Sequence, residues 1–209
     1  MEDTPVRDAR RPGRGQQARH RLLEAAVAQL ADVGMRGLTH RRVEQRAGLA
    51  QGSAKYYFGP LDALVEAVLT HLLTEELPLV LEVSPEERAD AMAKGETEAL
   101  LTRARAVVEA VSARPDRVRA RFILYLHAAG DPHLEHLVGE ARDVMVARIA
   151  ESLPGPAAEV GARFVCALVD GMLLDQLSAP SEVVEAHAAR FVLAAGAAGA
   201  QLARGGPGE

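Results

Sequence analysis

The stretch AGLAQGSAKYYFGPLDAL, which runs from Ala47 to Leu64, places a lysine and two tyrosines on one turn of a short helix. Aromatic residues make up only 3% of the chain, so their concentration here is unusual. Gly48 and Gly59 are placed to end helices, because glycine adopts left-handed backbone conformations at low cost. Thr39 offers a side-chain oxygen that can cap the start of a short helix that runs to about Ala47. The pattern predicts two short helices joined by a tight turn, which is the helix-turn-helix arrangement.

The second short helix, from about Gly52 to Phe58, is predicted to have one apolar and one polar side. At 100° per residue, Ala54 and Phe58 point towards a small core. Hydroxyls, a cation and a phenol lie on the other sides, contributed by Ser53, Lys55, Tyr56 and Tyr57. Such groups suit contacts to phosphates and base edges, and the second helix of a helix-turn-helix enters the DNA major groove. The sequence therefore predicts a DNA-reading surface.

The charges of the chain are distributed unevenly. The formal net charge is −5, whereas residues 1–60 carry 11 Lys or Arg against 6 Asp or Glu. The excess of acidic residues therefore lies beyond residue 60. A basic head on an acidic body predicts a polyanionic partner at one end only, although chance segregation of charges gives the same count.

Composition narrows the class of protein. Hydrophobic residues make up 48% and charged residues 25% of the 209 residues, as in soluble globular proteins. The start of the chain has no apolar core typical of a secretory signal, and the longest uncharged apolar run, Phe191 to Ala203, is too short to span a bilayer. Cys166 is the only cysteine, so no intrachain disulfide can form. We expect a cytoplasmic protein with no membrane partner.

Helical periodicity and capping residues predict an all-α chain of about nine helices. Residues 1–15 have no apolar periodicity and are predicted to be a disordered basic arm. A first helix from about Gln16 should end at Gly34, and another should begin at Leu61. Further helix starts are predicted at Ser84-Pro85-Glu86-Glu87, Pro115, Asp131-Pro132, Ala157 and Ser181, with the last helix fraying near Arg204.

The segment LLEAAVAQLADVGMRGLTHRRVEQRAGLAQGSAKYYFGPLDALVEAVL resembles the N-terminal domain of TetR/AcrR-family transcriptional regulators. The features that match are Gly34-x-x-Gly37-Leu38-Thr39, Ala47-Gly48-Leu49, Gly52-Ser53, Phe58 and Leu64. The match covers about residues 16–70, and LVDGMLLDQL, Leu168–Leu177, is similar to part of the family's dimerisation helix. The resemblance implies an Ω-shaped, all-α homodimer. Its domains would be a three-helix DNA-binding domain at 16–60, a helical ligand-binding and dimerisation domain at 61–204, and a disordered tail at 205–209.

The resemblance and the outward face of the second helix together define the expected DNA-binding residues. These are Thr39, Arg41, Arg42, Gln51, Gly52, Ser53, Lys55, Tyr56 and Tyr57. Two positions depart from the family pattern: Lys55 stands where tyrosine is usual, and Leu61 where lysine is usual. Lys55 can reach either a phosphate or a guanine edge, and the sequence leaves both contacts open.

The function predicted from these features is a ligand-responsive transcriptional regulator. We expect a repressor that is released from a palindromic double-stranded operator by a largely apolar small-molecule effector. The effector is expected to contact a few aromatic and methionine side chains of the C-terminal domain, namely Phe122, Tyr125, Met145, Phe164 and Met172. Two alternatives stay open: an all-α small-molecule-binding or enzymatic protein whose helix-turn-helix no longer reads DNA, and a dimeric interaction protein that uses its acidic body.

Other residues with reactive or charged side chains allow more than one interpretation. The arm arginines Arg7, Arg10, Arg11 and Arg14 either enter a minor groove or form a solubilising tail. His127, Asp131, His133 and His136 either bind zinc or form a polar helix start, and we favour the second because no cysteine is near. Cys166 fits core packing better than redox switching. Asp170 and Asp175 either face a ligand, cap a hydrogen bond or lie at a dimer edge. The sequence has no phosphate loop or nucleophile elbow, so we expect no catalytic residues, metal or cofactor.

Overall fold

The computed structural model describes residues 13–81 and 97–205, and within these ranges the regular structure is helical. The predicted all-α class is confirmed. The predicted helix start at Ser84-Pro85 and the arm residues Arg7, Arg10 and Arg11 lie outside the described residues. The chain divides between Val68 and Leu69 into two compact units, here called unit 1 and unit 2.

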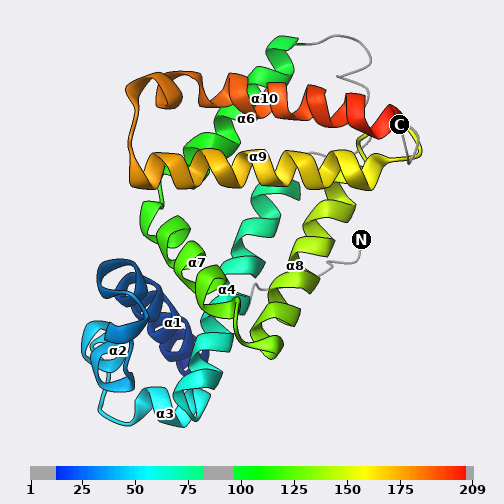
Figure 1. Ribbon diagram of the computed structural model, residues 1–209. Coiled ribbons are helices and arrows are strands. Elements are labelled where there is room, and N and C mark those ends of the chain that lie inside the picture. Colours follow the sequence, from blue (N-terminus) through cyan, green and yellow to red (C-terminus); the bar gives the residue numbers. More distant parts are fainter. Residues whose placement is uncertain (1–12, 82–96, 206–209) are drawn as a thin grey trace, which may run out of the picture. The chain divides into compact units, whose positions relative to one another are not determined.

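Unit 1 contains three helices of the N-terminal half and the beginning of a fourth (Figure 1). In order they are α1 (Arg14–Val33), the 3-10 turn η1 (Met35–Gly37), α2 (His40–Ala47), α3 (Ser53–Phe58) and α4 (Leu61–Leu81). The first helix begins at Arg14, slightly before the expected Gln16, and ends where predicted. There the amide of Gly34 donates to the carbonyl of Leu30 at 2.8 Å.

The core of unit 1 is built from leucines and valines that are almost fully enclosed. Leu22, Leu30 and Val43 are each 0% exposed, as is Leu64 at the start of α4. Ala54 of α3 is also 0% exposed. Its side chain is only a methyl group, so the backbone of this short helix lies close to the core. Small apolar side chains therefore let α3 lie close to the helices beneath it.

Unit 2 contains the rest of α4 and five further described helices. They are α6 (Thr97–Ser112), α7 (Pro115–Ala128), α8 (Pro132–Ala150), α9 (Ala158–Ser178) and α10 (Glu182–Arg204). The predicted starts at Pro115 and Pro132 are confirmed. Ser181 caps α10 by accepting a hydrogen bond from the amide of Val184 at 3.5 Å, as its position before an apolar run predicts.

The last two helices form an antiparallel hairpin whose backbones touch at one end (Figure 1). A Cβ added to Gly161 would lie 2.2 Å from the carbonyl oxygen of Gly199, and one added to Gly199 would lie 2.6 Å from Val165. The amide of Ala157 donates to the carbonyl of Ala203 at 3.0 Å. Glycine is required at both crossing positions, because any side chain would force the helices apart.

Candidate nucleic-acid interface and effector site

The helix-turn-helix begins with a capped helix and a left-handed turn. Thr39 is extended, and its hydroxyl accepts a hydrogen bond from the amide of Arg42 at 3.3 Å, which confirms the predicted cap. Gly48 ends α2 in the left-handed region with φ 61°, and Gly52 precedes α3 with φ 91°. The two glycines reverse the chain direction within a few residues, which places α3 across α2.

All nine predicted DNA-binding residues lie in the first turn of α2, in the connection, or in α3. Seven are exposed and two are partly exposed; the exposed ones are Thr39, Arg41, Arg42, Gln51, Gly52, Lys55 and Tyr56. The ring of Tyr56 is the most prominent, with 83% of the residue exposed, and it meets Tyr57 edge to face at 5.1 Å between centroids. The structure thus brings the predicted residues together around one short motif.

One predicted DNA-binding arginine also has a role inside unit 1. Nη1 of Arg42 donates to the carbonyl of Gly37 at 3.3 Å, and Nε2 of Gln29 donates to the same carbonyl at 3.3 Å. Gln29 in turn accepts from Arg46, which pairs with Asp32 at 2.6 Å. These bonds fasten α2 to α1, so part of the positive charge of this region holds the motif together.

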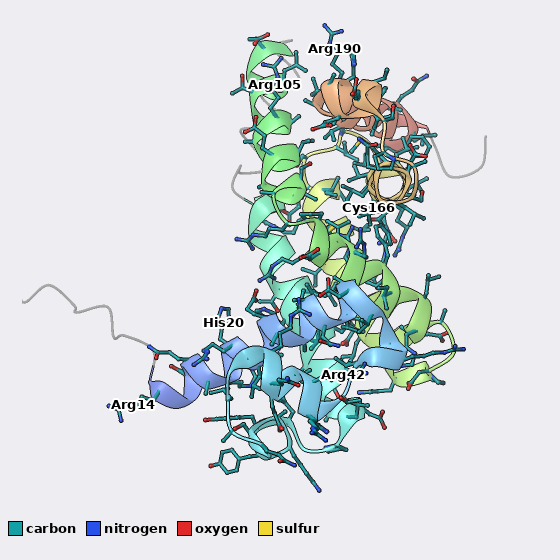
Figure 2. The ribbon with its side chains drawn as sticks, turned by 90° about the vertical axis from the view of Figure 1, so that its left-hand side faces the viewer. Arg14, His20, Arg42, Arg105, Cys166 and Arg190 are labelled. Atoms are coloured by element: carbon teal, nitrogen blue, oxygen red, sulfur yellow. The ribbon has the colours of Figure 1, made fainter. Side chains whose placement is uncertain are left out.

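The N-terminal turn of α1 lies beside the end of α3. A Cβ on Gly15 would lie 3.7 Å from the hydroxyl of Tyr57, and the Arg19 guanidinium sits 5.1 Å from the centre of the Phe58 ring. Figure 2 shows Arg14 at the start of α1 and Arg42 in α2. Arg14, which was expected in the disordered arm, is therefore a helical residue of unit 1.

A buried carboxylate that the sequence pattern did not predict lies beneath this surface. Glu44 is 4% exposed, and its Oε1 accepts a hydrogen bond from the amide of Ala54 at 2.9 Å. Its helical position gave no signal, because a glutamate on a short polar helix is ordinarily solvated. The partner is ten residues away in the chain, beyond the range of local capping patterns.

In unit 2, the predicted effector residues Phe122 and Tyr125 form one aromatic pair on α7. Their ring centroids are 6.2 Å apart and the rings meet edge to face. The buried guanidinium of Arg121 lies 4.9 Å from the Phe122 centroid and 5.7 Å from the Tyr125 centroid. This corner of unit 2 therefore combines aromatic surface with a cation.

Asp170 of α9 holds two arginines from neighbouring helices. Its carboxylate lies 2.5 Å from Nη1 of Arg142 on α8 and 3.4 Å from Nη2 of Arg121 on α7. Burial alone would lower the pKa of Arg142, but the hydrogen bond and charge of Asp170 raise the pKa above its ordinary value. Asp170 thus ties α7, α8 and α9 together, while Asp175 lines a cavity of the hairpin.

The other three predicted effector residues lie elsewhere in unit 2. Met145 packs against a small cluster that includes Val146 and Cys166. Phe164 is 36% exposed on α9. Met172 lines a cavity of about 550 Å³ between α9 and α10; its other lining residues are Leu168, Val169, Gly171, Asp175, Val184, Phe191, Val192, Ala194, Ala195 and Ala198. The five candidates are therefore spread over four places.

The histidine-rich stretch at the start of α8 has ordinary helix-capping contacts. The carboxylate of Asp131 accepts from the amides of His133 at 2.9 Å and Leu134 at 3.2 Å. Nε2 of His136 lies 3.3 Å from Glu140.

Cys166, labelled in Figure 2, is buried, and burial raises the pKa of its thiol. Among the described helices, only α10 is long and apolar enough to span a membrane, judged by its length and composition alone.

The fold and the helix-turn-helix surface define a DNA-binding transcriptional regulator. Residues 22–68 match the family model described as bacterial regulatory proteins, tetR family, and residues 95–198 match a tetracyclin repressor-like C-terminal domain. Together the two matches cover more than half of the chain. This chain belongs to the TetR family of transcriptional regulators.

Relatives and solved structures agree with this family. The HTH-type transcriptional regulator BetI of Burkholderia ambifaria is 29% identical over 164 residues, which are 75% of this chain and 80% of that protein. A TetR-family structure from Streptomyces coelicolor is 25% identical, with a TM-score of 0.67 over 86% of this chain and 98% of the other. The multidrug binding protein EbrR complexed with malachite green is 26% identical, with a TM-score of 0.63 over 88% and 98%.

Family membership confirms the prediction of a ligand-responsive DNA-binding regulator. TetR-family regulators bind DNA, dimerise and bind small-molecule effectors. The family consists of transcriptional regulators rather than enzymes.

Proposed function

We propose that this chain is a homodimeric, cytoplasmic repressor that binds a palindromic operator and leaves it when a largely apolar small molecule binds. In this proposal residues 16–60 contact DNA, and residues 61–204 bind the effector and dimerise. The observation that carries the proposal is the outward side of α3. Lys55 and the 83% exposed Tyr56 stand opposite Ala54, which is 0% exposed.

The nine predicted DNA-binding residues would make two kinds of contact with DNA. The hydroxyl and guanidinium groups at the start of α2 suit phosphates, which fix the orientation of the protein. The side chains of α3 suit base edges in the major groove. Two copies related by a two-fold axis would read two half-sites about one helical turn apart, roughly 34–36 Å, and this symmetry is why we propose a palindrome.

An exposed apolar surface on the α9–α10 hairpin supports dimerisation. Large apolar residues of the two helices stay accessible to solvent in the single chain: Val160, Phe164, Leu168, Leu174, Val183, Phe191 and Leu202. A Cβ added to Gly171 or to Gly196 would meet no atom within 4 Å, so another helix can approach these positions. A four-helix bundle of two hairpins would cover this surface, and it explains the apolar character of α10 without a membrane.

Dimerisation can be tested at Gly171, one of the two open glycines. Gly171→Leu should shift the protein from dimer to monomer at micromolar concentration, because the leucine would occupy the space intended for the partner. Gly139→Leu is the matched control, since Gly139 also has open space around it but lies on α8. Light scattering of both variants decides the matter: an unchanged dimer for Gly171→Leu, or a monomeric parent protein, would contradict the proposed interface.

The operator can be identified by selecting duplexes from a random-sequence pool with the parent protein. We expect enrichment of one inverted repeat whose half-sites are about 10 base pairs apart from centre to centre. Tyr56→Ala should enrich this repeat less strongly than the parent protein does. A pool that stays random after repeated rounds would contradict DNA reading and favour a regulator-like protein that binds only small molecules.

The effector is proposed to contact Phe122 and Tyr125, with Met145, Phe164 and Met172 as further candidates. The Arg121–Asp170–Arg142 cluster beside the aromatic pair would give such a ligand one polar anchor in an apolar setting. Complexes of EbrR with malachite green and with ethidium support a small-molecule site in a related regulator. An effector acts by binding the released form more tightly than the DNA-bound form.

Malachite green is a suitable first probe for this site. We expect it to displace the selected duplex, and Phe122→Ala should weaken displacement about tenfold while leaving the duplex affinity of the ligand-free protein unchanged. Leu126→Ala serves as the comparison, because Leu126 also lies on α7 but is 80% exposed. Equal losses of duplex binding and thermal stability in Phe122→Ala would instead mark the ring as structural.

A further inference from the structure

The recognition helix α3 lacks a side-chain cap of its own. It has only six residues, and its N-cap is Gly52, which offers no side chain. Gly52 has φ 91°, a left-handed conformation that a serine or aspartate adopts only with strain. The turn geometry therefore removes the usual capping residue from the helix that faces DNA, and a helix this short is not stable alone.

Glu44 of α2 supplies the missing acceptor. Its Oε1 accepts from the amide of Ala54, the second residue of α3, at 2.9 Å. Its backbone carbonyl accepts from the amide of Leu49 at 3.0 Å, so the same residue also fixes the start of the connection. The carboxylate is enclosed with 4% of the residue exposed, and burying a charged group is costly unless it is well bonded.

We propose that Glu44 is a positioning residue for DNA reading, which sets the orientation of α3 on α2 without touching DNA. This inference rests on the proposed function. The bond crosses from one helix to the other, so it fixes the direction of α3 as well as its stability. A change in that direction moves Lys55, Tyr56 and Tyr57 together, and contacts to base edges tolerate less displacement than contacts to phosphates do.

Because of the Glu44–Ala54 bond, the N-termini of α2 and α3 would contribute differently to DNA binding. A negative carboxylate already occupies the positive end of α3, so a phosphate is disfavoured there. At α2, the uncharged hydroxyl of Thr39 accepts from the amide of Arg42, and Thr39, Arg41 and Arg42 are exposed. Glu44 therefore directs α3 to approach DNA with its side chains rather than with its backbone amides.

Three substitutions of Glu44 separate the bond from the charge. Glu44→Gln keeps an oxygen acceptor at the same reach, Glu44→Asp keeps the charge but is one methylene too short, and Glu44→Ala removes both. Gln45→Ala is the control, because Gln45 is the exposed neighbour on α2. Each protein is measured against the duplex selected by the parent protein and against a scrambled duplex of the same composition.

We expect the affinity for the selected duplex, relative to that for the scrambled duplex, to fall about tenfold in Glu44→Ala and Glu44→Asp. Loss of a helix cap changes an equilibrium constant by about a factor of ten, and here it weakens only the sequence-specific complex. Glu44→Gln should stay within about threefold of the parent, and binding to the scrambled duplex should change little in all variants. Hydrogen exchange at the Ala54 amide should speed up in Glu44→Ala and Glu44→Asp but not in Glu44→Gln.

The outcomes discriminate between explanations. A lower melting temperature with an unchanged affinity ratio in the folded variants would show a purely structural role and overturn the inference. If Glu44→Ala does not fold, Glu44→Asp carries the same test. If the parent protein enriches a duplex and all variants bind it equally well, only the role of Glu44 is refuted. If the parent protein enriches no duplex, the proposed function is refuted as well.

Discussion

The α2–α3 pair of unit 1 and the α9–α10 pair of unit 2 are each two consecutive helices joined by a short connection, yet their apolar surfaces differ. The short pair hides its apolar residues within the chain, since Val43 and Ala54 are both 0% exposed. The long pair leaves Leu168 44% and Phe191 45% exposed. The α2–α3 pair thus buries its apolar side chains and turns polar groups outward, whereas the hairpin leaves apolar surface exposed, where we propose that a second copy binds.

The largest expected effect comes from truncating a buried leucine of unit 1, compared with an exposed leucine of the hairpin. Leu22→Ala in unit 1 should cost about 3–5 kcal/mol of unfolding free energy, because a fully enclosed leucine leaves a cavity. Leu168→Ala should cost less than ~1 kcal/mol in the monomer, since its side chain is already half exposed, but it should weaken the dimer. Denaturant unfolding at low concentration, together with sedimentation, measures both quantities. Equal costs in the monomer would remove the contrast between the regions.

The hairpin itself offers a second, smaller contrast between two glycines of α10. Gly199→Ala should destabilise the monomer by about 1–3 kcal/mol, because its Cβ would lie 2.6 Å from Val165 and 2.8 Å from the carbonyl oxygen of Gly161. Gly196→Ala meets open space and should stabilise the helix by up to ~1 kcal/mol. Thermal unfolding of the two variants is the measurement, and a destabilised Gly196→Ala monomer would show that its surroundings are not open.

In the proposed DNA-reading surface, removal of the Tyr56 ring should affect DNA binding but not folding. Tyr56→Ala should reduce affinity for the selected duplex about tenfold, whereas its melting temperature should stay close to that of the parent because 83% of the residue is exposed. Titration of the duplex at fixed salt tests this expectation. A large loss of thermal stability would instead give this ring a packing role.

The smallest effect is expected for Lys55, which is exposed on α3. If the lysine contacts a phosphate, Lys55→Ala should weaken binding to all duplexes alike and reduce the magnitude of the log–log salt slope by about one. If it contacts a guanine, the loss should instead be ~1–3 kcal/mol at a single base position. We favour the phosphate. Affinities for the duplex and its single-base variants at several salt concentrations distinguish the two contacts.

Local signals made much of the fold readable from the sequence. The cap at Thr39, the stops at Gly34 and Gly48, and the proline starts of α7 and α8 act within a few residues of where they stand. The residues predicted to bind DNA could be proposed for the same reason, because all of them lie on one short motif. Patterns with a period of one helical turn need no knowledge of distant partners.

The contacts that the sequence did not predict join residues far apart in the chain. In the sequence, Asp170 is an unexplained charge on an apolar helix. In the structure it accepts a hydrogen bond from Arg142 of α8, which lies 28 residues away in the chain. Glu44 likewise becomes explicable only when α3 places the Ala54 amide over it. The effector candidates were chosen by residue type, and residue type alone does not reveal which helix face meets which neighbour, so they are dispersed over unit 2.

The junction where α9 begins has a practical consequence for protein engineering. The carbonyl of Ala203 accepts the amide hydrogen of Ala157, and a side chain at Gly155, which has φ 106°, would collide with the same carbonyl. An affinity tag or reporter fused beyond Gly205 leaves this junction whole. A truncation that removes the last turn of α10 would release the Ala157 amide, so purification schemes and sensor fusions should keep residues up to Gly205.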